Sequence, residues 1–248
     1  MERVDFSSAF IVWASSALML KPRLIWQLMF DDGVLVRTKR FVADYVYTQA
    51  FVGFEGADEV LLLDVTRRGR SDASFRAMAD YADKCFVPVA MGGNIGCLDD
   101  VKRFFDIGAD KIVLGRAAAP LTEPAAAKWG CQAAVVGLDA RCWPGRDLAE
   151  LAHEMNAEQG AGEILLQSVE RDGSLRGYDL ALLERVLAGV KCPVVIGGGY
   201  GGWRHAAEAI KLGAGGCALS NIFHLTEAHM AMAKQNLANE GVPVREAV

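Results

Sequence analysis

The sequence lacks the residue patterns of metal-binding and disulfide-bonded proteins. Its 248 residues include four histidines and six dispersed cysteines, with no C-x-x-C pair and no histidine placed to complete a zinc site. Dispersed cysteines are typical of a protein that keeps free thiols in a reducing compartment. We therefore expect a cytoplasmic protein with no metal and no other cofactor.

The sequence also lacks runs of like charge and long apolar segments. The net charge of -5 is spread along the chain, so we expect no binding to nucleic acid or to an anionic membrane. Ala9–Leu20 is mostly apolar, but it is shorter than a membrane span and follows Glu2, Arg3 and Asp5 rather than a basic region. A small molecule and another protein are the expected partners.

The chain is expected to form one domain after a short N-terminal extension. Met19 opens "MLKPRLI", where the first core strand begins, so residues 1–18 are either an added helix or a start-codon artefact, and we favour the artefact. Residues 19–248 have the length of one α/β barrel, and no low-complexity linker divides them.

Short apolar runs alternate with segments of helical period, such as Asp99–Ile107 and Leu180–Ala188, which indicates repeated βα units and a parallel sheet. Eight strands with crossover helices favour a closed (βα)8 barrel. The predicted strands are Arg23–Phe30, Glu59–Val65, Val87–Met91, Lys111–Leu114, Ala133–Asp139, Glu163–Ser168, Pro193–Gly197 and Gly216–Leu219.

An internal repeat supports the barrel. "GADEVLLLDVTRRG" from Gly56 aligns without a gap on "GAGEILLQSVERDG" from Gly160, and "PVAMGG" from Pro88 aligns on "PVVIGG" from Pro193. Strands two and three therefore recur as strands six and seven. Such a repeat of half-barrels argues against an open doubly wound sheet and predicts a TIM barrel with two-fold symmetry.

Glycine-rich loops follow strands three and seven, at the barrel end where this fold carries its chemistry. A glycine backbone can approach a phosphate closely, although glycines also form tight turns with no ligand. Because the loops recur in both halves, we favour a phosphate site in the second half, whereas in the first half a phosphate site and a tight turn are equally consistent with the sequence. The first-half candidates are Gly92, Gly93, Asn94, Gly115 and Arg116, and the second-half candidates are Asp172, Gly173, Ser174, Gly198, Gly199, Ser220 and Asn221.

Asp139 is the candidate acid or base. It ends the apolar run "AAVVGLD", where burial would favour proton transfer, although capping and ion pairing are equally consistent with an aspartate there. Asp64 ends "LLLD" with the same ambiguity. The repeat places Met29 opposite Asp139, and a thioether cannot exchange protons. Asp31 and Asp32 lie nearby in the sequence but are displaced along the strand.

The chain resembles the cyclase subunit of imidazole glycerol phosphate synthase, from Met19 to about Arg245. The motifs that carry the resemblance include "GADEVLLLDV", "GLDAR", "GAGEILLQSVERDGSLRGYDL" and "FH" at Phe223–His224. "LVRTKRF" and "CFVPV" are similar to the branch of this family associated with acetamidino-sugar formation, which also lacks the strand-one aspartate.

The resemblance implies a pair of catalytic aspartates, one at Asp139 and the other at the position of Met29, where it is absent. It implies a lysine at the position of Arg37 in the first loop. It also implies that the two phosphates of a bis-phosphate substrate bind the two glycine-rich sites, although Asn94, Gly115 and Arg116 depart from the usual residues. The segment after strand five, Ala140–Asp147, is short for this family.

The resemblance further implies that a glutaminase docks on the N-terminal barrel face and delivers ammonia through a gate of four charges. The corresponding residues are Arg23, Glu59, Lys111 and Glu163, each at the start of a strand. Charged residues are common at solvated strand starts. Four matching positions with balanced charge favour the gate.

Three hypotheses follow. The first is a subunit that accepts ammonia from a partner glutaminase for a phosphorylated or nucleotide-linked acceptor, with Asp139 as the remaining proton-transfer residue. The second is an orthodox cyclase, a lyase of histidine biosynthesis, in which another group replaces the missing aspartate. The third is a non-catalytic subunit that binds a phosphorylated ligand.

Overall fold

The computed structural model describes residues 21–47, 56–67, 72–220 and 230–245. Eight parallel strands form a closed barrel, because β10 pairs with both β9 and β1. These strands are β1 (Arg23–Asp31), β4 (Glu59–Asp64), β5 (Val89–Gly92), β6 (Lys111–Leu114), β7 (Ala134–Leu138), β8 (Glu163–Gln167), β9 (Val194–Gly197) and β10 (Gly216–Leu219). The (βα)8 barrel expected from the sequence is confirmed, with strand ends shifted by up to two residues.

The strands are apolar on both faces because the barrel buries both. Alternate residues of β1, Ile25 and Met29 among them, point into the barrel and join an interior cluster with residues such as Leu61, Val113 and Leu165. The intervening residues face the surrounding helices in a second, larger cluster. Continuous burial on two faces explains why the strands appear as unbroken apolar runs rather than alternating patterns.

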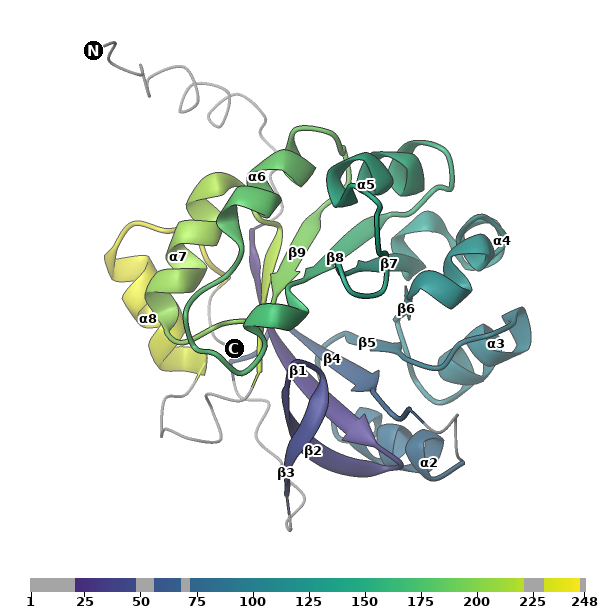
Figure 1. Ribbon diagram of the computed structural model, residues 1–248. Helices are drawn as coiled ribbons and strands as arrows, with labels where there is room; N and C mark the ends of the chain where they lie inside the picture. Colours follow the sequence, from purple (N-terminus) through teal and green to yellow (C-terminus); the bar gives the residue numbers. More distant parts are fainter. Residues whose placement is uncertain (1–20, 48–55, 68–71, 221–229, 246–248) are drawn as a thin grey trace.

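The helices surround the strands, as Figure 1 shows. They are α2 (Asp72–Ala82), α3 (Leu98–Asp106), α4 (Thr122–Trp129), α5 (Leu148–Ala157), α6 (Leu180–Leu187), α7 (Trp203–Leu212) and α8 (Met230–Asn239). Asp147 caps α5 by accepting hydrogen bonds from the backbone N–H groups of Ala149 and Glu150, at 2.8 and 3.3 Å. Asp179 caps α6 in the same way. These caps define the lengths of the βα loops that bear the site.

A β-hairpin inserted after β1 was not predicted. Antiparallel strands β2 (Val34–Lys39) and β3 (Val42–Val46) extend the sheet beside β1, and the hairpin lies at the lower centre of Figure 1. The turn between β1 and β2 has positive φ at Asp32 (51°) and Gly33 (80°), a conformation that Asp-Gly favours. The Asp-Gly pair could therefore have predicted this turn.

The tip of the hairpin is strained. Arg40 and Phe41 have φ of 52° and 54°, in the left-handed region that residues other than glycine rarely adopt. Hydrogen bonds to the barrel hold the tip in place: Arg141 Nη1 donates to Arg40 O at 2.7 Å, and Phe41 N donates to Asp172 Oδ2 at 3.1 Å. The hairpin is thereby fixed across part of the barrel mouth.

Candidate active site

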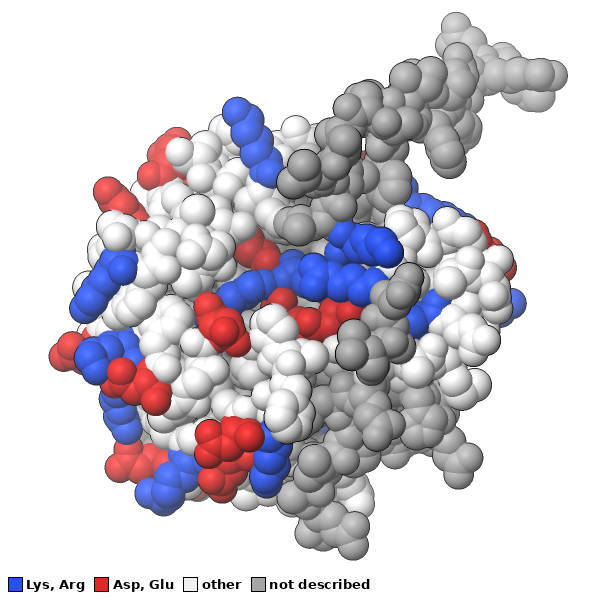
Figure 2. All heavy atoms as spheres, turned by 180° about the vertical axis from the view of Figure 1, so that it is seen from behind, with Lys and Arg blue, Asp and Glu red and all other residues white. Residues whose placement is uncertain are grey.

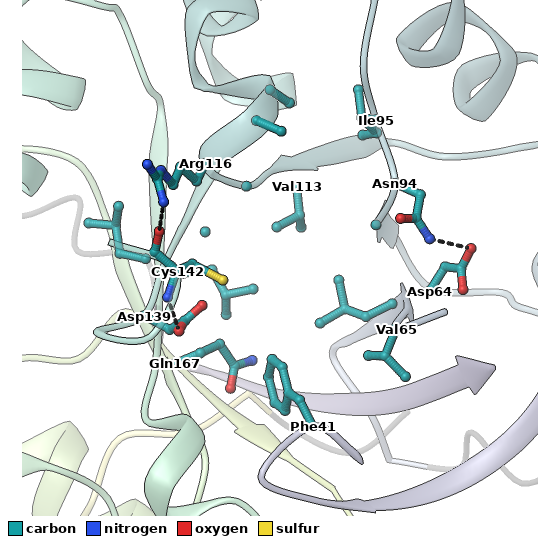
Figure 3. A pocket seen from close by; sticks show the side chains of 18 of the residues that line it. Phe41, Asp64, Val65, Asn94, Ile95, Val113, Arg116, Asp139, Cys142 and Gln167 are labelled. Carbon is teal, nitrogen blue, oxygen red and sulfur yellow. Dashed lines mark hydrogen bonds between the residues drawn. The ribbon is translucent and has the colours of Figure 1, made fainter. Parts of the chain in front are cut away.

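A cavity of about 740 Å³ opens at the carboxyl ends of strands β4 to β8, the end of the barrel where this fold carries its sites. Figure 3 shows Asp64 and Asn94 on one wall, Asp139, Cys142 and Arg116 on the opposite wall, and Phe41 at its edge. Val113, Leu165 and Gln167 come from the strands and line the floor. The space is large enough for a phosphorylated metabolite.

Asp139 lies directly after β7 and lines this cavity, as predicted. Its Oδ1 accepts hydrogen bonds from the backbone N–H groups of Arg141 and Cys142, at 2.9 and 2.8 Å. Burial raises the pKa of the neighbouring Cys142 thiol to about 11, and its hydrogen bond to Asp139 acts in the same direction. The thiol therefore stays protonated at neutral pH, and the Asp139 carboxylate is held in a fixed orientation.

Met29 points into the barrel interior and is 2% exposed. Its sulfur accepts a hydrogen bond from Gln27 Nε2 at 3.8 Å, and Gln27 Oε1 accepts one from Gln167 Nε2 at 2.8 Å. A pair of amides thus lies between β1 and β8. Asp31 ends β1 and Asp32 lies in the following turn, and neither lines the cavity, so neither carboxylate takes the position opposite Asp139.

The first-half phosphate candidates are partly assembled in the cavity. Gly93, Asn94, Gly115 and Arg116 line it, whereas Gly92 is the last residue of β5 and does not. Asn94 Nδ2 donates to Asp64 Oδ2 at 3.2 Å and to Thr66 O at 3.0 Å. Asp64 therefore joins the loops after β4 and β5, and it also lines the cavity.

Arg67, Arg141 and Phe41 are among the cavity side chains that were not singled out from the sequence. Arg67 and Arg141 each lie three residues beyond a strand end, in the loops where most functional residues of this fold are found. Their positions shortly after predicted strands could have identified them as site candidates. Phe41 had no such signal, because it reaches the cavity only through the hairpin.

The second-half candidates lie beside the hairpin. Asp172 Oδ2 accepts from Thr38 Oγ1 at 2.7 Å, and a Cβ on Gly173 would lie 2.8 Å from Lys39 Cγ. Gly198 and Gly199 have φ of 85° and 98° and pack against backbone, because a Cβ on either would lie 2.3 Å from a carbonyl oxygen. Ser220 follows β10, and Asn221 lies outside the described residues.

Arg37 stands where the resemblance implied a first-loop lysine. Its guanidinium pairs with Asp44 at 2.7 Å and lies 5.6 Å from the centre of the Tyr45 ring, so it is engaged within the hairpin and does not line the cavity.

The buried Asp172 carboxyl predicts a measurable pH effect. Burial raises its pKa, and the opposing hydrogen bonds from Thr38 and Phe41 and the charge of Arg141 do not offset this. The folded state therefore binds a proton at Asp172 more tightly than the unfolded state. The contribution of Asp172 to the free energy of unfolding is largest below the unfolded pKa of about 3.9 and is lost as pH rises through the folded pKa.

Asp172→Asn should remove this dependence, because an amide oxygen at the Oδ2 position keeps both hydrogen bonds without a buried charge. We expect the variant to match or exceed the wild-type melting temperature at pH 7 and to lose that advantage towards acid pH. Thermal melts of both proteins from pH 4 to 8 check it. Asp44→Asn is the control: ion pairing lowers the pKa of Asp44, so the difference should have the opposite sign. A constant difference for Asp172→Asn would contradict this account.

The four charges predicted at the strand starts form one closed ring. Arg23 contacts Glu59 at 2.5 Å and Glu163 at 2.7 Å, and Lys111 contacts the same two carboxylates at 2.8 and 3.1 Å. Each carboxylate thus lies between two cations. The ring lies at the end of the barrel opposite the cavity, with the interior cluster between them.

Burial and charge act in opposite directions on Arg23. Burial lowers its pKa, while Glu59 and Glu163 raise it, and the net shift is upwards. The guanidinium therefore remains charged within the ring.

Figure 2 shows the face behind the view of Figure 1, where basic side chains cross the centre and acidic side chains lie next to them.

Two further observations concern the whole chain. All six cysteines lie in described residues, and all have free thiols. Among the residues that the structure describes, no helix combines the length and the apolar character needed to cross a bilayer.

Comparison with known proteins identifies the family. The model of the histidine biosynthesis protein family matches residues 29–229. The imidazole glycerol phosphate synthase subunit HisF of Gluconacetobacter diazotrophicus is 35% identical over 251 residues, covering 92% of this chain and 97% of that protein. The chain belongs to this family. The HisF subunit of Caulobacter vibrioides is also 35% identical, over 253 residues and the same shares of the two chains.

Membership of the HisF-like family confirms the resemblance stated from the sequence. The match to the family model begins at Met29, so the first aligned position is also the one at which the implied aspartate is absent. The structure and the family assignment together describe a HisF-like barrel with Asp139 in an open cavity, an intact ring of four charges, and a buried thioether in β1.

Proposed function

We propose that this chain is a divergent HisF-like synthase subunit that accepts ammonia from a partner glutaminase and delivers it to a phosphorylated or nucleotide-linked acceptor. The glutaminase docks at the N-terminal ends of the strands, ammonia passes the ring into the barrel, and the acceptor occupies the cavity beside Asp139. Asp139 moves the proton in this reaction. The free thiols are compatible with a cytoplasmic enzyme.

The ring of four charges is the observation that carries this proposal. Burying two cations and two carboxylates costs free energy that a well-packed apolar set would not, so the ring is not needed for stability alone. A polar constriction at the barrel axis gives ammonia a point of entry that the surrounding apolar interior lacks. The ring is complete, whereas the acid-base pair has lost one member at Met29.

The proposal is tested with the glutaminase subunit from the same organism. The purified chain should bind it and should raise its rate of glutamine hydrolysis by about tenfold or more, the size of a typical coupling between two sites. Lys111→Met, which removes the most exposed charge of the ring, should reduce this stimulation. Lys102→Met breaks an exposed ion pair on α3 instead and should leave it unchanged.

Failure to bind the glutaminase, or binding without any change in its rate of glutamine hydrolysis, would contradict the proposal.

A second candidate is the orthodox cyclase of histidine biosynthesis. It is favoured by the 35% identity to HisF subunits over nearly the whole chain and by the position of Asp139 in the cavity. It predicts turnover of the family's bis-phosphate substrate.

The third candidate, a non-catalytic subunit that binds a phosphorylated ligand, is favoured by the loss of the strand-one carboxylate alone. It predicts phosphate binding with no turnover under any ammonia supply.

A further inference from the structure

We propose that the cavity recognises a diphosphate group, held by the guanidinium groups of Arg67, Arg116 and Arg141. The inference rests on the proposed function in one respect, that the cavity is the acceptor site. It goes further by naming the chemical class of the acceptor, a diphosphate ester rather than a compound with two separate phosphates.

Three arginine side chains line one cavity. Arg67, Arg116 and Arg141 come from the loops after β4, β6 and β7, and none of them forms an ion pair with a carboxylate among the residues of the described ranges. Arg116 Nη1 donates to Cys142 O at 3.2 Å and Arg141 Nη1 to Arg40 O at 2.7 Å. Carbonyl oxygens orient these guanidiniums without cancelling their charge.

The charges of Arg116 and Arg141 both affect the Cys142 thiol in the cavity wall. Both guanidiniums lower the pKa of Cys142, against the larger effects of burial and of Asp139, so both charges lie near its thiol. Figure 3 shows Arg116 beside Cys142 and Asp139 at the edge of the open space. Each guanidinium can donate several N–H groups to phosphoryl oxygens, so two of them near one point suit two neighbouring phosphoryl groups.

The carboxylates of the cavity do not offset these charges fully. Asp139 accepts from two backbone N–H groups, and Asp64 accepts from Thr66 and from the Asn94 amide. Both are held by neutral donors, and with three arginines they leave the cavity with an excess of positive charge. An anionic ligand is therefore favoured in this half of the barrel.

The other half of the barrel argues against two widely separated phosphates. There the hairpin occupies the loop after β8, because Thr38 and Phe41 bind Asp172 and Lys39 lies against Gly173. A ligand whose second phosphate lay at the loop after β8 would place that end against the hairpin. A diphosphate keeps its whole charge within the cavity that the three arginines line, and the organic part can lie against Phe41 and Leu165 in the remaining space.

Isothermal titration calorimetry of the full chain tests this with three probes. Inorganic pyrophosphate should bind about tenfold or more tightly than inorganic phosphate, and more tightly than a sugar bisphosphate whose phosphates lie at opposite ends of the sugar. Arg67→Gln, Arg116→Gln and Arg141→Gln should each weaken pyrophosphate binding by about tenfold, as expected for a lost charged hydrogen bond. Lysine at these positions should restore only part of the affinity, because it lacks the planar fork.

Arg76→Gln, on the exposed face of α2, is the matched control and should leave the affinity unchanged. Equal affinity for phosphate and pyrophosphate, tighter binding of the sugar bisphosphate, or pyrophosphate binding that none of the three variants weakens would each overturn the inference. Glutaminase binding measured on the same preparations separates this failure from failure of the proposed function, because the two depend on opposite ends of the barrel.

Discussion

With ammonium as the nitrogen source, the chain should turn over the family's bis-phosphate substrate about 10²- to 10⁴-fold more slowly than a HisF relative, the usual contribution of one general acid or base. Met29 replaces the second carboxylate, and a thioether neither gives nor takes a proton. Product formation measured side by side with the Gluconacetobacter diazotrophicus subunit checks this. Comparable rates would favour the orthodox cyclase instead.

Two variants make the comparison specific. Met29→Asp restores a carboxylate within β1 and should recover part of the lost rate, whereas Met29→Leu, which has a similar volume, should recover none. Asp139→Asn in the Met29→Asp background should abolish the recovered activity. A gain with Met29→Leu would show that packing, not proton transfer, limits the rate.

Removal of one ring carboxylate should destabilise the protein strongly. Glu163→Ala leaves Arg23 and Lys111 to share Glu59 in a buried position. We expect the free energy of unfolding to fall by about 3–5 kcal/mol, the cost of leaving a buried charge without its partner. Urea denaturation followed by circular dichroism measures it.

Asp106→Ala is the matched control for the ring. It breaks the ion pair between Lys102 and Asp106, whose side chains are 57% and 54% exposed, and such pairs contribute little to stability. Equal effects of Glu163→Ala and Asp106→Ala would mean that the ring is solvated in solution rather than buried.

The sequence predicted the parts of the site that follow from strand order and repeat. The family resemblance implied the four members of the ring, and they stand at strand starts that the barrel brings together. Asp139 was predictable because it ends an apolar run. In both cases the position along a strand decides where the side chain points, and that position can be inferred from the neighbouring residues of the sequence.

The remainder depends on contacts between distant segments. Nothing in the sequence pairs Thr38 with Asp172, 134 residues away, yet that hydrogen bond places the hairpin over the second half of the barrel. Likewise, whether Arg67 and Arg141 share a cavity depends on how the loops after β4 and β7 pack. The position of the hairpin over the loop after β8 and the grouping of the arginines around one cavity therefore depend on tertiary contacts.

The thioether of Met29 also determines how two side-chain amides are oriented in the barrel interior. Sulfur can only accept a hydrogen bond, so Gln27 must turn its NH₂ group towards Met29 and its oxygen towards Gln167. Gln167 then presents its own oxygen, which has no hydrogen-bond partner, on the side of Gly197. Met29, Gln27 and Gln167 thus form one hydrogen-bonded unit, in which a residue that cannot transfer protons still determines which end of each amide its neighbours meet.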